Sequence, residues 1–218
     1  MLTIQIRKNK KEEVFKKILE RIVELEFKPG QILNEKGLAE EFGVSRPVVR
    51  EVFYRLENLG FITFIHKIGI QVKEIDFRAI GEIMEIRIEI EKLLGKFVLK
   101  KITPQELQEL KAIMEKIHQL NVEENYSEFI ALDKEFHTKI RNVCKNELLR
   151  STSEKYYLHV NRMWAHTQAR VTDVGNIIKS MDDMVTALEN KDEKAMTNAI
   201  IQHSNSFLKQ IRNYFTIE

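Results

Sequence analysis

Two groups of side chains in this sequence have the types and the spacing to carry chemistry. Arg46 and Arg50 lie four residues apart and directly after the turn Gly43-Val44-Ser45, so they fall on one side of a helix that begins there. An arginine guanidinium group can bind guanine O6 and N7, or a phosphate, through two parallel hydrogen bonds. The spacing therefore predicts a helix start that reads double-stranded DNA.

The second group consists of Asp133, His137 and His203. Asp133 and His137 stand four residues apart, which places them on one helix face about 6 Å apart, and His203 lies on the inward side of a later helix. A carboxylate with imidazoles suits Zn²⁺, Mn²⁺ or Ni²⁺, so we predict these three as ligands of one divalent metal. The alternative is a buried Asp–His pair beside an unrelated core histidine, and the spacing leaves both open.

The stretch Ile32–Leu59 supplies the elements that must position the arginines. Asn34 can cap one short helix and Gly43 can close it, because glycine tolerates the left-handed conformation that ends many helices. Ser45 is a good N-cap for a second helix, and Pro47 is tolerated in its first turn because that turn has unpaired N–H groups anyway. This is the pattern of a helix-turn-helix.

A β-hairpin is expected after the helix-turn-helix. Two extended runs, Phe61–Ile65 and Ile70–Lys73, flank His66-Lys67-Ile68-Gly69, which is typical of a hairpin wing. Lys36, at the start of the first short helix, is placed to reach a backbone phosphate. His66 and Lys67, at the wing tip, could contact a phosphate or the adjacent minor groove.

The helix-turn-helix and the wing together resemble a known family. The stretch PGQILNEKGLAEEFGVSRPVVREVFYRLENLGFI is similar to the winged-helix domain of the GntR superfamily, and the resemblance extends over about residues 12–73. Pro47 comes one place earlier than in the family pattern, and the wing is short. The resemblance implies that Lys36, Arg46, Arg50 and His66 occupy DNA-contact positions. The predicted DNA contacts are Lys36, Ser45, Arg46, Arg50, His66, Lys67 and Gly69.

The rest of the chain predicts an antiparallel helical bundle. Apolar residues recur at helical spacing from Phe77 onward, and Thr103-Pro104-Gln105-Glu106 is a capping box with proline at the first helical position. The polar stretch Gln168–Asn176 is predicted to be a loop. The expected helices cover residues 79–101, 104–120, 126–143, 146–166, 177–189 and 193–215.

This region also resembles a family, the FCD ligand-binding domain of FadR-type GntR regulators. The matching pieces are MEIRIEIE, LDKEFHTKI, KNELL and MVTALENKDEKAMTNAIIQH, over about residues 78–207. Metal-binding members resemble D-x-x-x-H on one helix with a histidine on each of the last two helices. Asp133, His137 and His203 match three of these positions, but Met181 stands at the fourth.

Met181 leaves two readings of the metal site. A thioether is a poor ligand for Zn²⁺ or Mn²⁺, so the fourth ligand would be water, a carboxylate of the effector, or a displaced side chain such as His159 or His166. Alternatively the site has lost its metal, as in the fatty-acyl-responsive branch of the family. The sequence leaves open whether a Zn, Ni or Mn ion is a cofactor.

Arg87 is the predicted effector-binding residue. It interrupts an otherwise apolar helix and could clamp a carboxylate with paired hydrogen bonds. The alternative is an interhelical salt bridge to a neighbouring glutamate. The family resemblance favours contact with an effector.

Composition restricts the class of protein. The 218 residues include 8 Gly and 3 Pro, which fits a mainly α-helical chain, and Cys144 as the single cysteine excludes an internal disulfide. No signal peptide and no run of 18 apolar residues is found, so we expect a cytoplasmic protein without a membrane partner. The net charge of +2 is uneven, because residues 1–73 carry 14 Lys and Arg against 10 Asp and Glu.

The sequence thus predicts a winged helix-turn-helix DNA-binding domain over residues 1–75 and an all-α effector-binding and dimerisation domain over residues 76–218. The expected protein is a homodimeric transcription regulator, controlled by a small-molecule effector, that binds an operator. One rival is a metal-dependent enzyme, but HExxH, GxSxG and P-loop motifs are missing from the sequence. The other rival is an interaction module with a vestigial helix-turn-helix.

Overall fold

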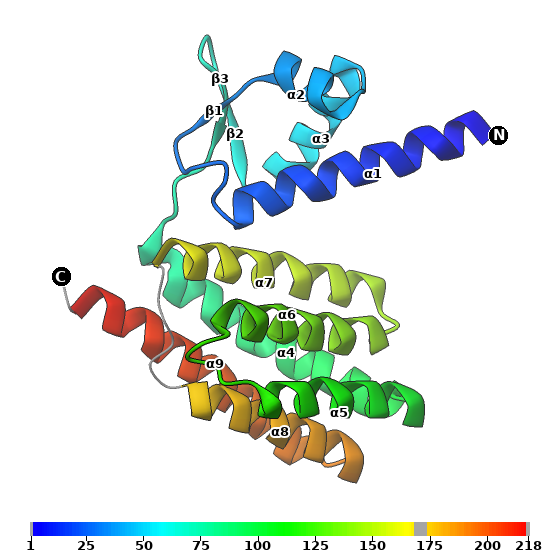
Figure 1. The fold of residues 1–218 in the computed structure, drawn as a ribbon, viewed down its shortest axis with the longest axis vertical. Helices are drawn as coiled ribbons and strands as arrows, with labels where there is room; N and C mark the ends of the chain where they lie inside the picture. The colour runs from blue at the N-terminus through cyan, green and yellow to red at the C-terminus, as the bar shows by residue number, and fades with distance from the viewer. Residues whose placement is uncertain (1, 168–173, 217–218) are drawn as a thin grey trace. The chain divides into compact units, whose positions relative to one another are not determined.

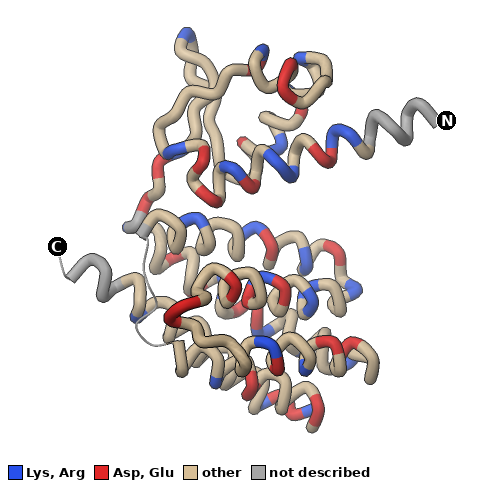
Figure 2. The backbone as a smooth tube through the Cα atoms, viewed as in Figure 1, with Lys and Arg blue, Asp and Glu red and all other residues tan. Residues whose placement is uncertain are grey.

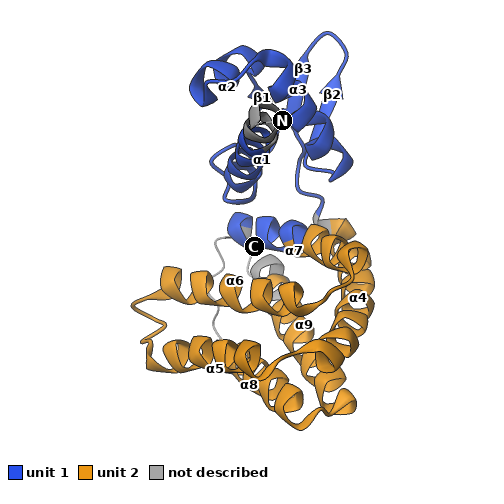
Figure 3. Ribbon diagram, turned by 90° about the vertical axis from the view of Figure 1, so that its right-hand side faces the viewer, with its two compact units in different colours: residues 1–77, 158–166 blue, residues 78–157, 167–218 orange. Residues whose placement is uncertain are grey.

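The computed structural model describes residues 2–167 and 174–216, which form nine α-helices, one short 3-10 helix and three short strands (Figure 1). The chain divides into two compact units, one of residues 1–77 with 158–166 and the other of residues 78–157 with 167–218 (Figure 3). The predicted fold class, a mainly α chain with a winged helix-turn-helix and a helical bundle, is confirmed.

The first unit combines three helices with a small sheet. Its elements are α1 (Leu2–Val23), β1 (Ile32–Leu33), α2 (Glu35–Phe42), α3 (Arg46–Asn58), β2 (Ile62–Ile65) and β3 (Gly69–Val72). Ile18 and Ile22 of α1 are fully buried in one core with Val49 and Phe53 of α3. Because α3 buries this apolar face, its polar face must point outward.

The helix-turn-helix follows its local sequence signals with one exception. Asn34 caps α2, since its side chain accepts a hydrogen bond from the Gly37 N–H at 3.0 Å, and Gly43 ends α2 with φ of 61°. Ser45 occupies the N-cap position of α3, but its side chain makes no capping hydrogen bond, which corrects the expected role of its hydroxyl. Pro47 lies in the first turn of α3, as predicted.

The wing belongs to a three-stranded antiparallel sheet with the order β1-β3-β2. Strands β2 and β3 pair as a hairpin, with Ile62 opposite Val72 and Ile65 opposite Gly69. Strand β1 was not predicted, because a two-residue strand leaves no periodic pattern in the sequence. It pairs with β3 through Leu33 and so joins the start of α2 to the wing.

The second unit consists of helices and short connections, with no strand among its described residues. Its elements are the 3-10 turn η1 (Phe77–Ala79) and α4 (Ile80–Lys101), α5 (Pro104–Gln119), α6 (Tyr126–Val143), α7 (Glu147–Thr167), α8 (Val174–Asn190) and α9 (Glu193–Thr216), of which α7 also contributes residues 158–166 to the first unit. Helix α9 packs against both α4 and α8, and α5 packs against α6 and α8. Thr103 and Glu106 form the predicted capping box, and Asp192 caps α9 by accepting from the Ala195 N–H at 2.9 Å.

The predicted loop Gln168–Asn176 is only partly within the described residues. Residues 168–173 lie outside them, so the prediction for that part stays open. Residues Val174–Asn176 belong to α8, and the prediction is wrong there. The polar Asn176 is exposed on the first turn of that helix, which explains why the apolar pattern begins only at Ile177.

Several helices have the length to cross a bilayer, and α9 is the longest with 24 residues. Their apolar residues are interrupted by charged ones at short intervals. No helix among the described residues is both long enough and apolar enough to span a membrane.

Candidate functional site

The polar face of α3 carries the two arginines that were predicted to read DNA. Arg46 is at the first position of the helix and Arg50 follows one turn later, with 61 % and 54 % of their side-chain surface exposed. Both side chains reach Glu35, the first residue of α2. Arg46 Nε lies 3.2 Å from Glu35 Oε1, and Arg50 Nε and Nη2 each lie 3.0 Å from Glu35 Oε2.

Glu35 therefore holds both guanidinium groups side by side at the start of α3. Its own side chain is only 10 % exposed, so the carboxylate is fixed while the arginines remain open to solvent. Ordering two long side chains in advance lowers the conformational entropy that is lost when an anion binds. The sequence analysis missed Glu35, and the available signal was its place directly after the capping Asn34, at the helix start that meets α3.

Lys36 and the wing residues also lie on the surface of the first unit. Lys36 is 73 % exposed on α2, with Glu40 as an ion-pair partner at 3.8 Å. His66 and Lys67 are exposed in the turn between β2 and β3, and Gly69 is exposed at the start of β3. Lys67 and Gly69 have φ of 64° and 127°. All the predicted DNA contacts thus belong to the first unit, on α2, α3, the turn between them and the wing.

The net charge of the chain does not by itself define this surface. Figure 2 shows Lys and Arg interspersed with Asp and Glu along the helices of both units. A site for an anion therefore depends on local groups, such as the exposed arginines at the start of α3.

The second unit brings the three predicted metal ligands together. The ligand atoms of Asp133 and His137 on α6 and His203 on α9 all lie within 4.8 Å of one another. His137 Nε2 is 3.1 Å from His203 Nε2 and 3.5 Å from Asp133 Oδ1. Both imidazoles are 7 % exposed, and the carboxylate is partly buried.

Ser180 of α8 fixes the tautomer of His203. The Ser180 hydroxyl donates its single hydrogen to the Ile177 carbonyl oxygen at 2.7 Å, so it must accept at its contact with His203 Nδ1, 3.0 Å away. His203 therefore carries its proton on Nδ1 and presents a bare Nε2 lone pair to His137. This is the tautomer that a metal-ligating Nε2 requires.

The charge states around these histidines follow from burial and from their neighbours. Burial, with smaller electrostatic contributions from the neighbouring His137 and Arg87, lowers the pKa of His203 from 6.5 to about 3. Burial alone raises the pKa of Asp133, but the charge and hydrogen bond of His137, with His203 and Arg87, outweigh it and lower that pKa below its usual value. At neutral pH the group thus holds a carboxylate and a neutral His203.

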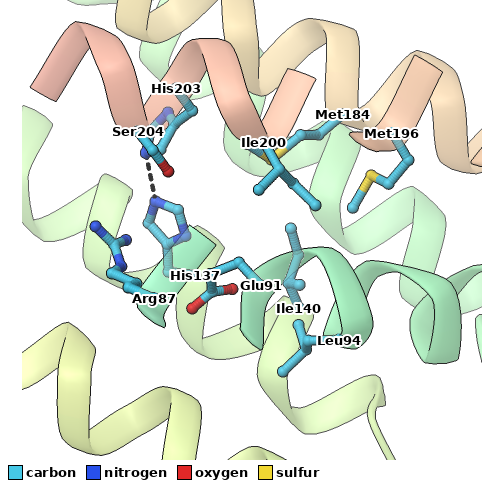
Figure 4. Close-up of a pocket in the computed structure, with 10 residues that line it drawn as sticks. All are labelled: Arg87, Glu91, Leu94, His137, Ile140, Met184, Met196, Ile200, His203 and Ser204. Atoms are coloured by element: carbon cyan, nitrogen blue, oxygen red, sulfur yellow. Dashed lines mark hydrogen bonds between the residues drawn. The ribbon is translucent and has the colours of Figure 1, made fainter. Parts of the chain in front are cut away.

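A small pocket lies beside the histidines. Its walls are Arg87, Glu91, Leu94, His137, Ile140, Met184, Met196, Ile200, His203 and Ser204 (Figure 4). In Figure 4, Arg87 and the two histidines lie at one end, and Leu94 and Met196 lie toward the other. The pocket therefore has a polar end, with Arg87 and two imidazoles, and an apolar end.

Arg87 of α4 is buried, with 4 % of its surface exposed, and its Nε has no hydrogen-bond partner among the described residues. Its Nη1 contacts Met84 Sδ at 3.9 Å, and its guanidinium lies 5.9 Å from the centre of the Tyr157 ring. No ion pair between Arg87 and a glutamate is found in the described part of the chain, so the salt-bridge alternative is not supported. A buried cation with an unused donor is suited to a bound anion.

The other proposed ligand positions lie elsewhere. Met181 is fully buried on α8 and is not among the pocket walls. His159 Nε2 contacts the Leu59 carbonyl oxygen at 2.8 Å, and its ring stacks on Phe61 with centroids 4.3 Å apart, so His159 belongs to the first unit. His166 is exposed and is not part of the Asp133 cluster. Neither histidine therefore replaces the fourth ligand.

Two family models match this chain. The model described as "Bacterial regulatory proteins, gntR family" matches residues 10–72. The model described as "FCD domain" matches residues 82–206, which is more than half of the chain. The two matches cover the helix-turn-helix with its wing and the helical bundle with its pocket.

Curated relatives and solved structures agree with these models. The chain is 24 % identical to the "HTH-type transcriptional repressor RspR" of Escherichia coli K12 over 92 % of this chain and 88 % of that one. It is 26 % identical to the "Uncharacterized HTH-type transcriptional regulator YdhC" of Bacillus subtilis, over 86 % and 84 % of the two chains. The solved structure "E. coli McbR/YncC" is similar in fold, with a TM-score of 0.81, 21 % identity and coverage of 94 % and 98 %.

The shifted pKa of His203 predicts how the metal-free protein responds to acid. The unfolded chain protonates this histidine near pH 6.5 and the folded chain only near pH 3, so the unfolded state binds more protons between these values. The free energy of unfolding should therefore fall as the pH is lowered below about 6.5. Thermal unfolding of chelator-treated protein between pH 7 and pH 4 measures this slope.

The matched variants are His203→Gln in the pocket and His66→Gln on the exposed wing. His203→Gln should flatten the fall of the unfolding midpoint with decreasing pH, whereas His66→Gln should keep the wild-type slope. Equal slopes in wild type and His203→Gln would show that His203 is not the group that titrates.

Proposed function

This chain belongs to the gntR family of bacterial regulatory proteins, with an FCD domain after its helix-turn-helix, and is a DNA-binding transcriptional regulator; we propose that a small carboxylate bound in the FCD pocket controls its operator binding. The single observation that carries the proposal is the buried Arg87, which lines a pocket together with His137 and whose Nε has no hydrogen-bond partner among the described residues. A regulator of this family is not an enzyme, which sets aside the metal-dependent enzyme as a rival.

We propose that α3 enters the major groove with Arg46 and Arg50 facing base edges. Both side chains are exposed at the N-terminal end of α3, which is the end that reads bases in helix-turn-helix proteins. Their attachment to Glu35 supports this role, because it holds the two guanidinium groups in a defined arrangement before DNA arrives. The guanidinium N–H groups of Arg46 and Arg50 that do not bind Glu35 would be available to guanine.

The other predicted contacts would serve the phosphate backbone. Lys36 is a single exposed positive charge at the start of α2, and Lys67 and His66 are exposed on the wing. Phosphate contacts position a protein on DNA but carry no sequence information. Ser45 and Gly69 would add contacts in the turn and wing.

These two roles predict different effects of alanine substitution. Arg46→Ala should weaken binding to the preferred duplex by about 1–3 kcal/mol and relax its discrimination, whereas Lys36→Ala should weaken all duplexes alike and reduce the salt slope by about 1. The probes are a duplex enriched from a random library by the wild-type protein and a scrambled duplex of the same length. Fluorescence anisotropy over a range of salt concentrations gives both quantities.

Retention of full discrimination by the double variant Arg46→Ala/Arg50→Ala would contradict the assignment of α3. Absence of duplex binding by the wild-type protein, even at low salt, would favour the remaining rival, an interaction module with a vestigial helix-turn-helix.

The pocket is suited to a ligand with one acidic end. Arg87 supplies a fixed positive charge, and Asp133 and Glu91 are the acidic groups nearby. Glu91 Oε1 is already held by the Ser153 hydroxyl at 2.8 Å, and Asp133 lies against His137, so both carboxylates have partners. A carboxylate on the effector could pair with Arg87, while its carbon chain would lie against Leu94 and Ile200.

The donor set of Asp133, His137 and His203 also fits a divalent metal. Two ligand atoms about 2.1 Å from one tetrahedral ion lie about 3.4 Å apart. The His137–His203 and Asp133–His137 separations of 3.1 Å and 3.5 Å are close to this value, and all three ligand atoms lie within 4.8 Å of one another. The bare Nε2 of His203 supports ligation, and Ser180 would act as its outer hydrogen-bond partner. A bound Zn, Ni or Mn ion would supply a second positive charge for the effector's carboxylate.

Calorimetric titration of Zn²⁺, Mn²⁺ and Ni²⁺ into chelator-treated protein tests the metal. One saturable site per chain is expected, and His137→Ala should abolish it, because two ligands rarely hold such an ion firmly. The control His66→Ala changes an exposed wing histidine and should bind metal as the wild type does. Absence of saturable binding, or binding that survives His137→Ala, would contradict a metal at this site.

We also propose that the regulator acts as a homodimer. One recognition helix reads too few base pairs for useful specificity, and a two-fold operator requires two heads related by the same symmetry. The second unit, which has helices and short connections but no strand among its described residues, would provide the dimer contact.

A further inference from the structure

An exposed aromatic side chain lies on the outward side of α3. Tyr54 follows Arg50 by four residues, as Arg50 follows Arg46, so the three side chains are neighbours on successive turns of the helix. Tyr54 is 52 % exposed, although burial of an aromatic ring is favourable. The DNA contacts proposed above do not include this residue.

The ring of Tyr54 stacks on Phe64 of β2, the strand that leads into the wing tip. The two ring centroids are 5.0 Å apart and the ring planes differ by 26°, which is a favourable stacked arrangement of aromatic rings. Phe64 is partly buried and also packs against the core of the first unit. The stack therefore joins the outward side of α3 to the wing.

Glu57, one turn after Tyr54 along α3, makes a second link to the same residue. Its Oε1 accepts a hydrogen bond from the Phe64 N–H at 3.2 Å. Strand β2 lies at the edge of the sheet, so the N–H groups along its outer side have no partner strand among the described residues. Glu57 thus fixes the backbone of Phe64 while Tyr54 fixes its side chain. We call Tyr54, Glu57 and Phe64 the wing brace.

The hairpin beyond Phe64 carries this fixed position to the wing tip. Ile65 pairs with Gly69, so the turn between them consists only of residues 66–68. Lys67 in that turn has the left-handed φ of 64°. A three-residue hairpin turn with one left-handed residue has a defined shape. The position of the tip relative to α3 is therefore set where Phe64 meets α3.

A small rotation of β2 would be enough to move the tip away from a bound duplex. Strand residues advance by about 3.3 Å each, so Lys67 lies about 10 Å beyond Phe64, and a rotation of about 10° at Phe64 would move it by about 2 Å. Hydrogen-bond lengths vary by only about 0.5 Å. Such a rotation would break the wing's phosphate contacts while the arginines of α3 stayed in place.

We propose that Tyr54 and Glu57 are positioning residues for DNA recognition. Acting through Phe64, they hold the wing beside α3 (Figure 1) at the angle that lets the wing tip and the arginines contact one duplex together. The inference rests on the proposed function, because it requires that α3 and the wing bind the same duplex. Tyr54 and Glu57 act on the wing and not by touching the DNA.

The distance between two spin labels tests the wing brace without DNA. The labels are placed on Asn58→Cys in α3 and Ile68→Cys at the wing tip, which are both exposed positions, in a Cys144→Ala background. Pulsed EPR should give one narrow distance distribution. Tyr54→Ala and Glu57→Ala should each widen it by about twofold or more, whereas Tyr54→Phe and Glu57→Gln keep the stack and the acceptor and should not. A distribution that neither alanine substitution changes would overturn the proposal.

Fluorescence anisotropy, with the duplex enriched by the wild-type protein, tests the effect on recognition. The tip variant His66→Ala/Lys67→Ala should weaken binding by about tenfold in the wild-type background. In a Tyr54→Ala background it should weaken binding by only about twofold or less, because a displaced wing has no contacts to lose. The matched control Arg55→Ala changes an exposed residue of α3 that pairs with Glu12 of α1, and should keep the full effect of the tip variant.

Three results of the anisotropy measurements would overturn the proposal. One is that the effects of the tip variant and Tyr54→Ala multiply, and another is that the tip variant binds normally, which would leave the brace no contact to position. The third is that Tyr54→Phe weakens binding as much as Tyr54→Ala, which would assign the role to a hydroxyl contact with DNA. A wild type that binds no duplex, with the EPR result as expected, would instead contradict the proposed function.

Discussion

Burial of one face of α3 is the constraint on which the proposed DNA-reading surface depends. Val49 and Phe53 are fully inaccessible in the core of the first unit, and this fixes the rotation of the helix about its axis. The opposite face must then carry Arg46 and Arg50 outward. The contacts of Glu35 also depend on this packing. A nearly buried carboxylate on α2 can hold two exposed guanidinium groups of α3 only if the two helices keep a fixed geometry. Core packing thus fixes the positions of the two arginines that we propose to read DNA.

The pocket of the second unit depends in a similar way on contacts between buried polar groups. Ser180 uses its only hydrogen on a backbone carbonyl, and this forces His203 to donate from Nδ1 and to leave Nε2 bare. Burial lowers the pKa of that imidazole, so the lone pair stays available well below neutral pH. Arg87 is also buried and lines the same pocket beside the histidines. The pocket therefore offers both a nitrogen ligand, from His203, and a cation, from Arg87, to a bound molecule.

The sequence predicted the elements that depend on local signals. Asn34, Gly43 and the Thr103 capping box each act within four residues, and the Asp133 and His137 pair is set by one helical turn. The missed features depend on contacts distant in sequence: strand β1 exists because β3 pairs with it, and Glu35 meets Arg50 across 15 residues. For Ser45 the local signal was misleading, because its residue type favours a capping hydrogen bond that its side chain does not make. The hydrogen bonds that fix the His203 tautomer could not be read from spacing either.

These features fit a regulator in which one unit reads DNA and the other binds a small acid through Arg87. The most direct test compares the wild type with Arg87→Met, which keeps the volume of the side chain and removes its charge, in operator binding with and without a panel of small carboxylates. If Arg87 binds the effector, at least one carboxylate changes the wild-type dissociation constant for DNA by tenfold or more, since allosteric coupling is typically about 1–3 kcal/mol. Arg87→Met should bind the same duplex normally and lose this response. An equal response in both proteins, or a wild type that ignores every carboxylate, would contradict control through this pocket.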